Sequence, residues 1–162
     1  MRKCLNLGCG QKPTLSNDEE EWQNLDAQRI PGVDIIHNLR EPLPFVNGSI
    51  DHILLDNVLE HVPYPHNVAL LNEIDRVLKV GGTCTIIVPH ALSGAQWQDP
   101  GHVSGYVPRS ALYWATDWPM PIGTPYGKLA GFTSNLVATS INTWGDRETE
   151  EFIRFDLVKE MP

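Results

Sequence analysis

Leu5-Asn6-Leu7-Gly8-Cys9-Gly10 is the stretch of sequence that decides the fold. A β-prone run at residues 3–7 leads into Gly-x-Gly, a turn in which the backbone bends sharply and a ligand can approach without meeting a Cβ. Pro13 replaces the third glycine of a dinucleotide fingerprint, and the Gly-Lys-Ser/Thr of a P-loop does not occur. The turn therefore favours a ligand with a nucleoside and an amino-acid end over one with a pyrophosphate. Taken alone, it fits a tight bend without a ligand equally well.

Polar side chains also close the next predicted strands. Asp26 ends a strand predicted at residues 22–26, sixteen positions after Gly10, which is close to the ~20 expected for an acid that binds ribose hydroxyls. The carboxyl ends of strands in an open α/β sheet line the ligand crevice. The same reasoning selects the groups that end or follow the strands predicted at 33–37 and 50–56: Asn38, Leu39, Asp56 and Asn57.

The rest of the chain predicts a lean, mostly parallel α/β sheet in a single domain, residues 1–162. Residues 89–130 break the regular pattern and are expected to form an irregular substrate or lid segment. Helical spacing of apolar residues, followed by Gly81-Gly82, defines the one long helix. The remaining predicted elements are that helix at 66–79, a strand at 83–88, and an antiparallel pair of strands at 132–141 and 151–158.

Composition and charge exclude several classes of protein. With 41% apolar and 20% charged residues, the chain is neither disordered nor collagen-like, and it has no apolar run of about 18 residues that would span a membrane. A formal charge of −8 without a basic run disfavours nucleic acid as a partner. The N-terminus lacks the apolar region of a signal peptide, and three cysteines without CxxC spacing disfavour disulfides and structural zinc. These features predict a cytoplasmic protein.

Several motifs in a fixed order carry a resemblance to a known family. They are LNLGCG at 5–10, NLD at 24–26, IIHNLREPLPF at 35–45, IDHILLDNVLEHV at 50–62 and RVLKVGGTCTIIVP at 76–89. Together they resemble the class I S-adenosylmethionine-dependent methyltransferases, and more closely the small bacterial and phage type, methyltransferase type 11-like, with an abbreviated first helix. The resemblance covers residues 3–90 well and 91–162 loosely. It implies a Rossmann-like sheet of order 3-2-1-4-5-7-6, with an antiparallel strand 7 near its edge.

The resemblance also implies S-adenosyl-L-methionine as the cofactor and a role for each binding candidate. Gly8, Cys9 and Gly10 would hold the methionine and ribose part. Asp26 would hold the ribose hydroxyls. The other implied contacts are Asn38 and Leu39 with the adenine, and Asp56 and Asn57 with the methionine end and the transferable methyl.

Two features depart from the family pattern. Only eleven residues separate Gly10 from Trp22, too few for a full first helix after the glycine turn. One face of the sheet is therefore expected to be thinly covered, and a partner chain, such as the second copy in a homodimer, is expected to shield it. Asn38 stands where the family commonly has Asp, which keeps a hydrogen-bond acceptor but removes a charge.

Asp99-Pro100-Gly101-His102 supplies the catalytic candidates. The segment follows the strand at 83–88 by a short loop, and similar D-x-x-H segments follow that strand in related methyltransferases. We expect a substrate lid in which His102 accepts or orients a proton beside Asp99. The expected substrate contacts are His61, Trp97 and Tyr106. In the alternative interpretation, Asp99 and His102 only hold a Pro-rich loop in place by hydrogen bonds. His61 then packs beside the cofactor pocket, and the aromatic residues belong to the core.

A zinc or iron site made by His90, Asp99 and His102 is chemically conceivable. The surrounding loop has no known ligand spacing, so no metal is predicted.

The sequence as a whole predicts an S-adenosylmethionine-dependent methyltransferase that acts on a small molecule, such as a sugar or metabolite hydroxyl. Alignment of nucleophile, methyl and sulfur can provide most of the acceleration, and a general base is needed only for a hydroxyl or a protonated amine. The main alternative is a non-catalytic protein of the same fold that acts as a scaffold or binds a partner. Pro13 and the missing phosphate loop disfavour a nucleotide-dependent oxidoreductase or hydrolase. The charge and the lack of an Asn-Pro-Pro-Tyr type motif disfavour a nucleic-acid methyltransferase.

Overall fold

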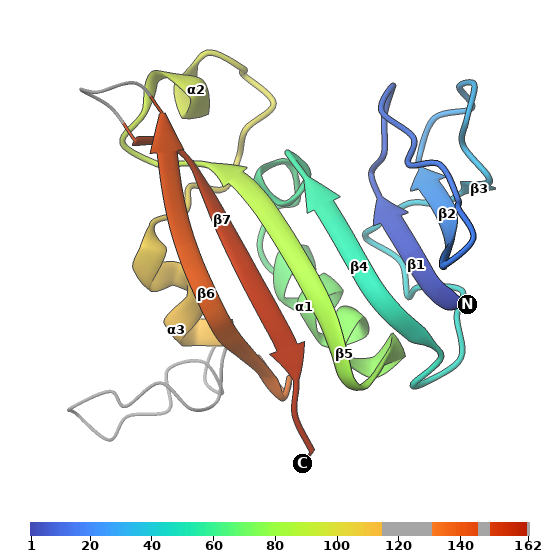
Figure 1. Cartoon of the computed structure of the whole chain (residues 1–162). Helices are drawn as coiled ribbons and strands as arrows, with labels where there is room; N and C mark the ends of the chain where they lie inside the picture. The colour runs from blue at the N-terminus through green and yellow to red at the C-terminus, as the bar shows by residue number, and fades with distance from the viewer. Residues whose placement is uncertain (115–130, 146–149, 162) are drawn as a thin grey trace.

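A computed structural model describes residues 1–114, 131–145 and 150–161, which form one seven-stranded sheet with few helices (Figure 1). The sheet order is β3-β2-β1-β4-β5-β7-β6. The strands are β1 (Arg2–Leu7), β2 (Glu20–Asp26), β3 (Ile35–Ile36), β4 (Ile50–Asp56), β5 (Leu78–Pro89), β6 (Leu136–Gly145) and β7 (Glu150–Lys159). Within the described ranges, no helix has the length and apolar character needed to cross a membrane.

Pairing of the strands confirms the predicted topology. β1, β2, β3, β4 and β5 pair in parallel, whereas β7 runs antiparallel to both β5 and β6. The carboxyl ends of the five parallel strands therefore meet at one edge of the sheet, the upper edge in Figure 1. In an open parallel sheet this is the edge where ligands bind.

The helices are α1 (His66–Val77), α2 (Gly94–Trp97) and α3 (Ala111–Trp114), with the 3-10 turns η1 (Leu59–His61) and η2 (Pro108–Ser110). α1 ends before residue 79, where the sequence predicts its end. The reason is tertiary: Leu78 is already extended and pairs with Ile50, so β5 begins there and continues through the Gly81-Gly82 pair. The backbone N–H groups of Gly48 and Ser49 bind the carbonyls of the last helical turn, which terminates the helix.

The strand predicted at 33–37 is only two residues long. The backbone around it is bonded to β2 at its two ends: the N–H of Asp34 donates to the carbonyl of Asn24 at 2.9 Å, and the N–H of His37 donates to the carbonyl of Asp26 at 2.9 Å. The Asp34 carboxylate also accepts from the backbone N–H of Asn24 at 2.8 Å, in place of a ladder partner.

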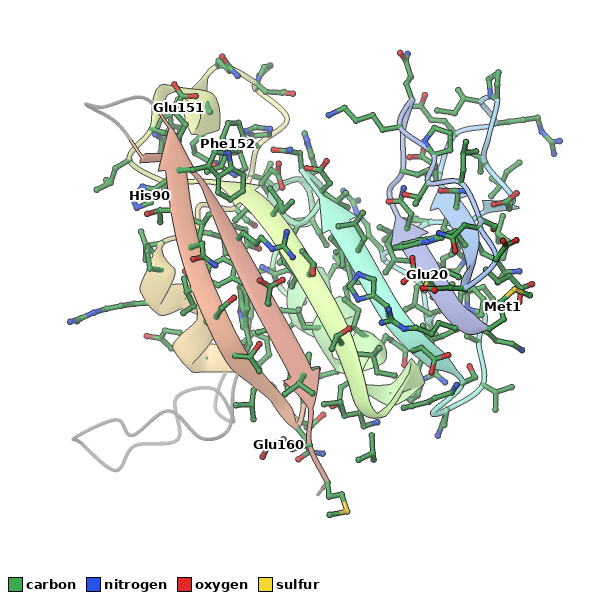
Figure 2. The ribbon with its side chains drawn as sticks, in the orientation of Figure 1. Met1, Glu20, His90, Glu151, Phe152 and Glu160 are labelled. Atoms are coloured by element: carbon green, nitrogen blue, oxygen red, sulfur yellow. The ribbon has the colours of Figure 1, made fainter. Side chains whose placement is uncertain are left out.

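The two faces of the sheet differ in what covers them. On the core face, apolar side chains of the strands pack against α1, and Figure 1 shows α1 and α3 on this side. Strand residues on this face include Leu5, Leu7, Ile53, Leu55, Ile86, Val88 and Phe155. No described helix lies over the opposite face, and Figure 2 shows side chains standing on it, Glu20 among them. The expectation of a thinly covered face is therefore correct, because residues 11–19 cross it as a loop without a helix.

Candidate functional site

The glycine turn after β1 is bonded directly to the end of β2. The backbone N–H groups of Gly8 and Cys9 both donate to the carbonyl of Leu25, at 2.8 and 3.0 Å. The N–H of Gly10 donates to Oδ2 of Asp26 at 2.9 Å, and Oδ1 of the same carboxylate accepts from the N–H of Gln28 at 2.9 Å. The acid and the glycine turn, which the sequence places together by spacing alone, are thus in contact.

Two glycines of the turn are required for different reasons. Gly8 has a φ of +68°, and a Cβ there would lie 2.7 Å from both methyl carbons of Val58. Gly10 has a φ of +51°, but a Cβ there would meet nothing within 4 Å. The backbone at Gly8 is therefore packed against the residues that follow β4, whereas Gly10 faces open space at the edge of the sheet.

The end of β4 lies against the same turn. Asn57 has a φ of +55°, which is uncommon for a residue other than glycine. Its backbone N–H donates to the carbonyl of Ile87 at 2.9 Å, and its side-chain amide donates to Oδ1 of Asp56 at 2.7 Å. Asp56 and Asn57 therefore form a polar pair fixed between the ends of β4 and β5, and the following Val58 contacts Gly8.

Asn38 and Leu39 follow β3 near Asp26. The N–H of His37 is bonded to the Asp26 carbonyl, so the next two residues begin at the same edge of the sheet. The side chain of Asn38 is exposed, and its Oδ1 accepts from the N–H of Arg40 at 3.1 Å. Leu39 is half-buried and packs against the core. Asn38 is thus an exposed amide side chain next to the partly buried apolar Leu39.

The Asp99–His102 segment lies on η1. The N–H groups of Val103 and Ser104 donate to the backbone carbonyl of Glu60 at 2.9 and 3.0 Å, and Oγ of Ser104 donates to the carbonyl of Val62 at 3.0 Å. Within the segment, Oδ1 of Asp99 accepts from the N–H of Gly101 at 2.7 Å. The described part of the irregular segment is thus anchored next to the end of β4, where the sequence predicts a lid.

His102 and His61 are neighbours in this arrangement. Their rings meet edge to face with centroids 4.7 Å apart. The Nε2 atom of His102 lies 3.9 Å from Oε1 of Glu60 and 3.9 Å from Oδ2 of Asp99. The His102 side chain is only 8% exposed, whereas His61 is open to solvent. Two residues predicted separately, one as catalytic and one as a substrate contact, therefore belong to one cluster.

Glu60 is the functional candidate that the sequence interpretation missed. Its side chain is 0% exposed, and neither carboxylate oxygen has a hydrogen-bond partner among the described residues. The pKa of its carboxyl is raised to about 7, chiefly by burial and in smaller part by the charges of Asp56 and Asp99, against the opposing effect of a bond from its own backbone N–H. The signal in the sequence was a carboxylate enclosed by Val58, Leu59 and Val62, where an ordinary surface residue is not expected.

The two aromatic candidates are in different environments. Trp97 is 72% exposed and its Nε1 donates to the carbonyl of Ala91 at 3.0 Å. Tyr106 is 6% exposed, packs edge to face with Trp114, and donates its hydroxyl to the carbonyl of Leu59 at 3.3 Å. Tyr106 therefore supports the turn that precedes Glu60 from inside the core, and we assign it that role instead of a substrate contact.

His90 takes no part in the histidine cluster. It is buried at the end of β5, close to the labelled Glu151 and Phe152 in Figure 2. Its Nδ1 accepts from the N–H of Leu92 at 3.1 Å, and its own N–H donates to the carbonyl of Glu151 at 2.8 Å. The set of His90, Asp99 and His102 considered from the sequence is thus not the set that the fold brings together. Within the described ranges, the residues whose potential metal-ligand atoms lie close together, within 4.8 Å of one another, are Glu60, His61 and His102.

Comparisons with known proteins agree with this fold. Residues 12–86 match the model of a methyltransferase domain family. A comparison with curated protein sequences found no match.

Three solved structures illustrate the similarity in fold. A 1,6-didemethyltoxoflavin-N1-methyltransferase from Burkholderia thailandensis, with its substrate and S-adenosylhomocysteine bound, is 12% identical with a TM-score of 0.64, covering 99% of this chain and 72% of that one. A SAM-dependent methyltransferase from Archaeoglobus fulgidus is 12% identical with a TM-score of 0.65, over 98% and 86%. A methyltransferase from Haloferax volcanii, in complex with the Trm112 activator, is 15% identical with a TM-score of 0.63, over 99% and 83%.

Proposed function

We propose that this chain, which has the fold of the class I S-adenosylmethionine-dependent methyltransferases and matches their domain model over residues 12–86, binds S-adenosyl-L-methionine and methylates a small molecule. The observation that carries the proposal is the hydrogen bond from the Gly10 N–H to the Asp26 carboxylate. It joins the Gly-x-Gly turn to the acid that suits a ribose, at the edge of the sheet where ligands bind.

Asp26 keeps the capacity that ribose binding requires. Each of its two carboxylate oxygens accepts one backbone N–H, from Gly10 and from Gln28. An ionised carboxylate offers about four lone-pair sites, so each oxygen retains one for a hydroxyl of the same ribose. The two backbone bonds also hold the carboxylate in one orientation, which lowers the entropic cost of binding.

The electrostatics of the edge favour a cationic ligand. Asp26, Asp56 and Asp99 lie at or near the ends of β2, β4 and β5, and the charges of the last two are felt at Glu60. A sulfonium carries a positive charge, so these carboxylates favour the charged cofactor over its neutral demethylated product. We assign Asp56 and Asn57 to the methionine end, and Asn38 with Leu39 to the adenine, because of their positions on either side of the glycine turn.

The cofactor supplies an activated methyl group, and the residues of this chain supply alignment. Transfer to an acceptor oxygen or nitrogen is an in-line displacement, for which orientation is the largest single contribution. The 99–104 segment, fixed to the backbone of Glu60, is in position to hold an acceptor above the end of β4. Asp99 and His102 are available to take the proton of a sugar or metabolite hydroxyl, with His61 and Trp97 exposed beside them.

Titration calorimetry with S-adenosylhomocysteine tests the cofactor site. We expect saturable binding that Asp26→Ala weakens by at least about tenfold, because a hydrogen bond to a charged group is worth about 1.5–3 kcal/mol. Asp18→Ala is the matched control, since Asp18 is an exposed carboxylate in the loop before β2. Absence of binding to the unaltered chain, or equal loss in both variants, would refute the proposal.

A second candidate function is that of a non-catalytic or partner-dependent protein of the same fold. The uncovered sheet face favours it, because this face has a hollow of about 360 Å³ lined by side chains of five or more strands, among them Arg2, Trp22, His52, Thr139 and Arg154. The similar chain from Haloferax volcanii is described in complex with an activator. In this second candidate function, the partner that covers the face is a second copy of the chain or another protein. Arg154→Glu would then abolish the complex seen by sedimentation while leaving S-adenosylhomocysteine binding intact.

A further inference from the structure

Glu60, His61 and His102 form a cluster that neither the methyltransferase fold nor the proposed cofactor site uses. One potential ligand atom of each residue lies within 4.8 Å of the others. Glu60 and His61 come from η1 and His102 from the segment after α2, so tertiary structure alone brings them together. The hydrogen bonds from Val103 and Ser104 to the carbonyl of Glu60 hold the two segments in this register.

The carboxylate of Glu60 is the first indication of a missing partner. It is fully buried, and neither oxygen has a hydrogen-bond partner among the described residues. A buried polar group without a partner is destabilising, and a buried carboxylate is retained when it is paired or coordinates a metal. Asp56 and Asp99 are also close enough to affect it, so the surroundings are acidic, and among the described residues no Lys or Arg side chain pairs with it.

The hydrogen bonds of the two histidines are the second indication. Nδ1 of His61 lies 3.1 Å from the carbonyl of Gly101, and Nδ1 of His102 lies 2.9 Å from the carbonyl of Gln96. A carbonyl oxygen only accepts, so Nδ1 carries the proton in both rings and Nε2 keeps its lone pair. A ring nitrogen that donates to a backbone carbonyl is the usual arrangement behind a metal-binding histidine, because it fixes the tautomer and the ring orientation.

We propose that Glu60, His61 and His102 bind one divalent transition-metal ion, with zinc as the reference metal. Two imidazoles and one carboxylate are a ligand set that zinc and iron use in open sites, where further positions are left to water or substrate. The exposed side of His61 gives the ion a path from solvent. Asp99, whose Oδ2 lies 3.9 Å from Nε2 of His102, adds negative charge next to the site.

A metal at this place would also take part in the proposed methyl transfer by activating the acceptor, and this part of the inference rests on the proposed function. The cluster directly follows the end of β4, where Asp56 and Asn57 are assigned to the methyl-bearing end of the cofactor. An acceptor hydroxyl bound at an open position of the ion would lose its proton to water more readily. Its oxygen would then form the new bond to the methyl carbon as the bond from that carbon to sulfur breaks. Metal binding itself needs neither cofactor nor acceptor.

Titration calorimetry of the untagged full chain with Zn²⁺, after treatment with a chelator, tests the site directly. We expect one ion per chain, and a weakening of at least about tenfold in Glu60→Gln, His61→Ala and His102→Ala, since even outer-shell changes typically cost roughly 10–100-fold. His66→Ala is the matched control, because His66 begins α1 outside the cluster. Addition of Co²⁺ should give visible absorption bands in the unaltered chain and in the control, and lose them in Glu60→Gln.

The exposed His61 keeps the test decisive if a change at the buried positions disturbs folding, because truncation of an exposed side chain leaves the core intact. Absence of saturable Zn²⁺ binding, or equal affinity in the control and the three cluster variants, overturns the proposal. S-adenosylhomocysteine binding is measured in chelator-treated protein. Its retention without zinc binding refutes only the metal site, and its loss with intact zinc binding refutes only the cofactor site.

Discussion

The two faces of the sheet differ in the side chains they carry: one is apolar and covered, and the other is polar and has no described helix over it. Strand β7 contributes residues to both faces. Ile153, Phe155 and Leu157 point into the core and are at most 1% exposed. Arg154 and Asp156, between them, stand on the face without a helix. The composition of the strand therefore follows the cover of the sheet: on the face without a described helix, β7 carries polar side chains.

Hydrogen bonds across the strands make the uncovered face compatible with water. Oδ1 of Asp156 accepts from Thr85 Oγ1 at 2.9 Å, and Oδ2 accepts from Ser140 Oγ at 2.8 Å. Burial opposes ionisation of Asp156, but these bonds and the contact with Arg154 outweigh it and hold its pKa below the usual value. The polar groups of Asp156 on this face are thus satisfied without a partner chain.

Glu60 gives the counterpart to Asp156. Both are carboxylates packed beside the sheet, but Asp156 on the open face has three donors, whereas Glu60, next to residues 99–104, has none among the described residues. The contrast predicts opposite dependences of stability on pH for the two groups.

The largest effect is expected on the core face. Phe155→Ala removes one of the largest fully buried side chains and its edge-to-face contact with Trp114, whose ring centroid lies 4.9 Å away. We expect the free energy of unfolding, from urea denaturation, to fall by about 3–5 kcal/mol. A loss below about 1 kcal/mol would mean that this face is not the true core.

Glu60→Gln should remove a pH dependence. The folded-state pKa is raised from 4.5 to about 7, so the folded chain holds a proton that the unfolded chain releases. The stability that this proton contributes is complete below pH 4.5 and is lost as the pH rises through 7. The loss is on the order of 3 kcal/mol for metal-free protein. We expect the difference in free energy of unfolding between wild type and variant to change between pH 4.5 and 7. Urea denaturation at a series of pH values, with a chelator present, measures this difference. A constant difference would contradict an unpartnered carboxylate.

Asp156→Asn tests the open face with the opposite sign. Because the folded-state pKa is lowered, the charged carboxylate contributes stability above its unfolded value of 3.8 and loses it as the pH falls. Loss of the charge should cost about 1 kcal/mol at neutral pH, since part of the bonding survives in the amide. Thermal melting of both proteins at pH 7 and in acid measures it. The gap in Tm should close in acid, and a gap independent of pH would assign the effect to packing.

The smallest effect is expected at the margin of the open face. Arg2→Gln breaks the pair in which Nη1 of Arg2 lies 2.7 Å from Oε1 of Glu20, with the arginine side chain 51% exposed. The expected loss of unfolding free energy is below about 1 kcal/mol and shrinks further in high salt. A larger loss that depends on protein concentration would indicate that a second copy covers this face.

Most of the fold could be predicted because its signals are local. Alternation of apolar and polar residues identifies β7, and the spacing of apolar residues identifies α1. The family pattern then supplies the sheet order, which the structure confirms. The end of α1 was predicted too late, because pairing of Leu78 with Ile50 is a long-range interaction that overrides helix propensity.

The binding candidates could be predicted for a related reason. They lie at strand ends, and parallel strands bring their carboxyl ends to one edge whatever the loops do. Their contacts with a cofactor stay predictions. The apolar neighbours of Glu60 in the sequence indicate burial of its carboxylate, but only the folded chain shows that neither oxygen has a donor among the described residues.

The sequence by itself determined where most strands and the long helix lie along the chain, the glycine turn and the acids that end the strands, because periodicity and turn chemistry act between near neighbours, and the family resemblance added the order of the strands in the sheet. Only the tertiary structure decided that the histidines at 61 and 102, forty-one positions apart, lie beside one buried carboxylate, and that Tyr106 supports the turn carrying it from within the core. Such groupings depend on how an irregular segment returns to the sheet. That path is set by hydrogen bonds between distant backbone groups, and these carry no signature in the linear pattern of side chains.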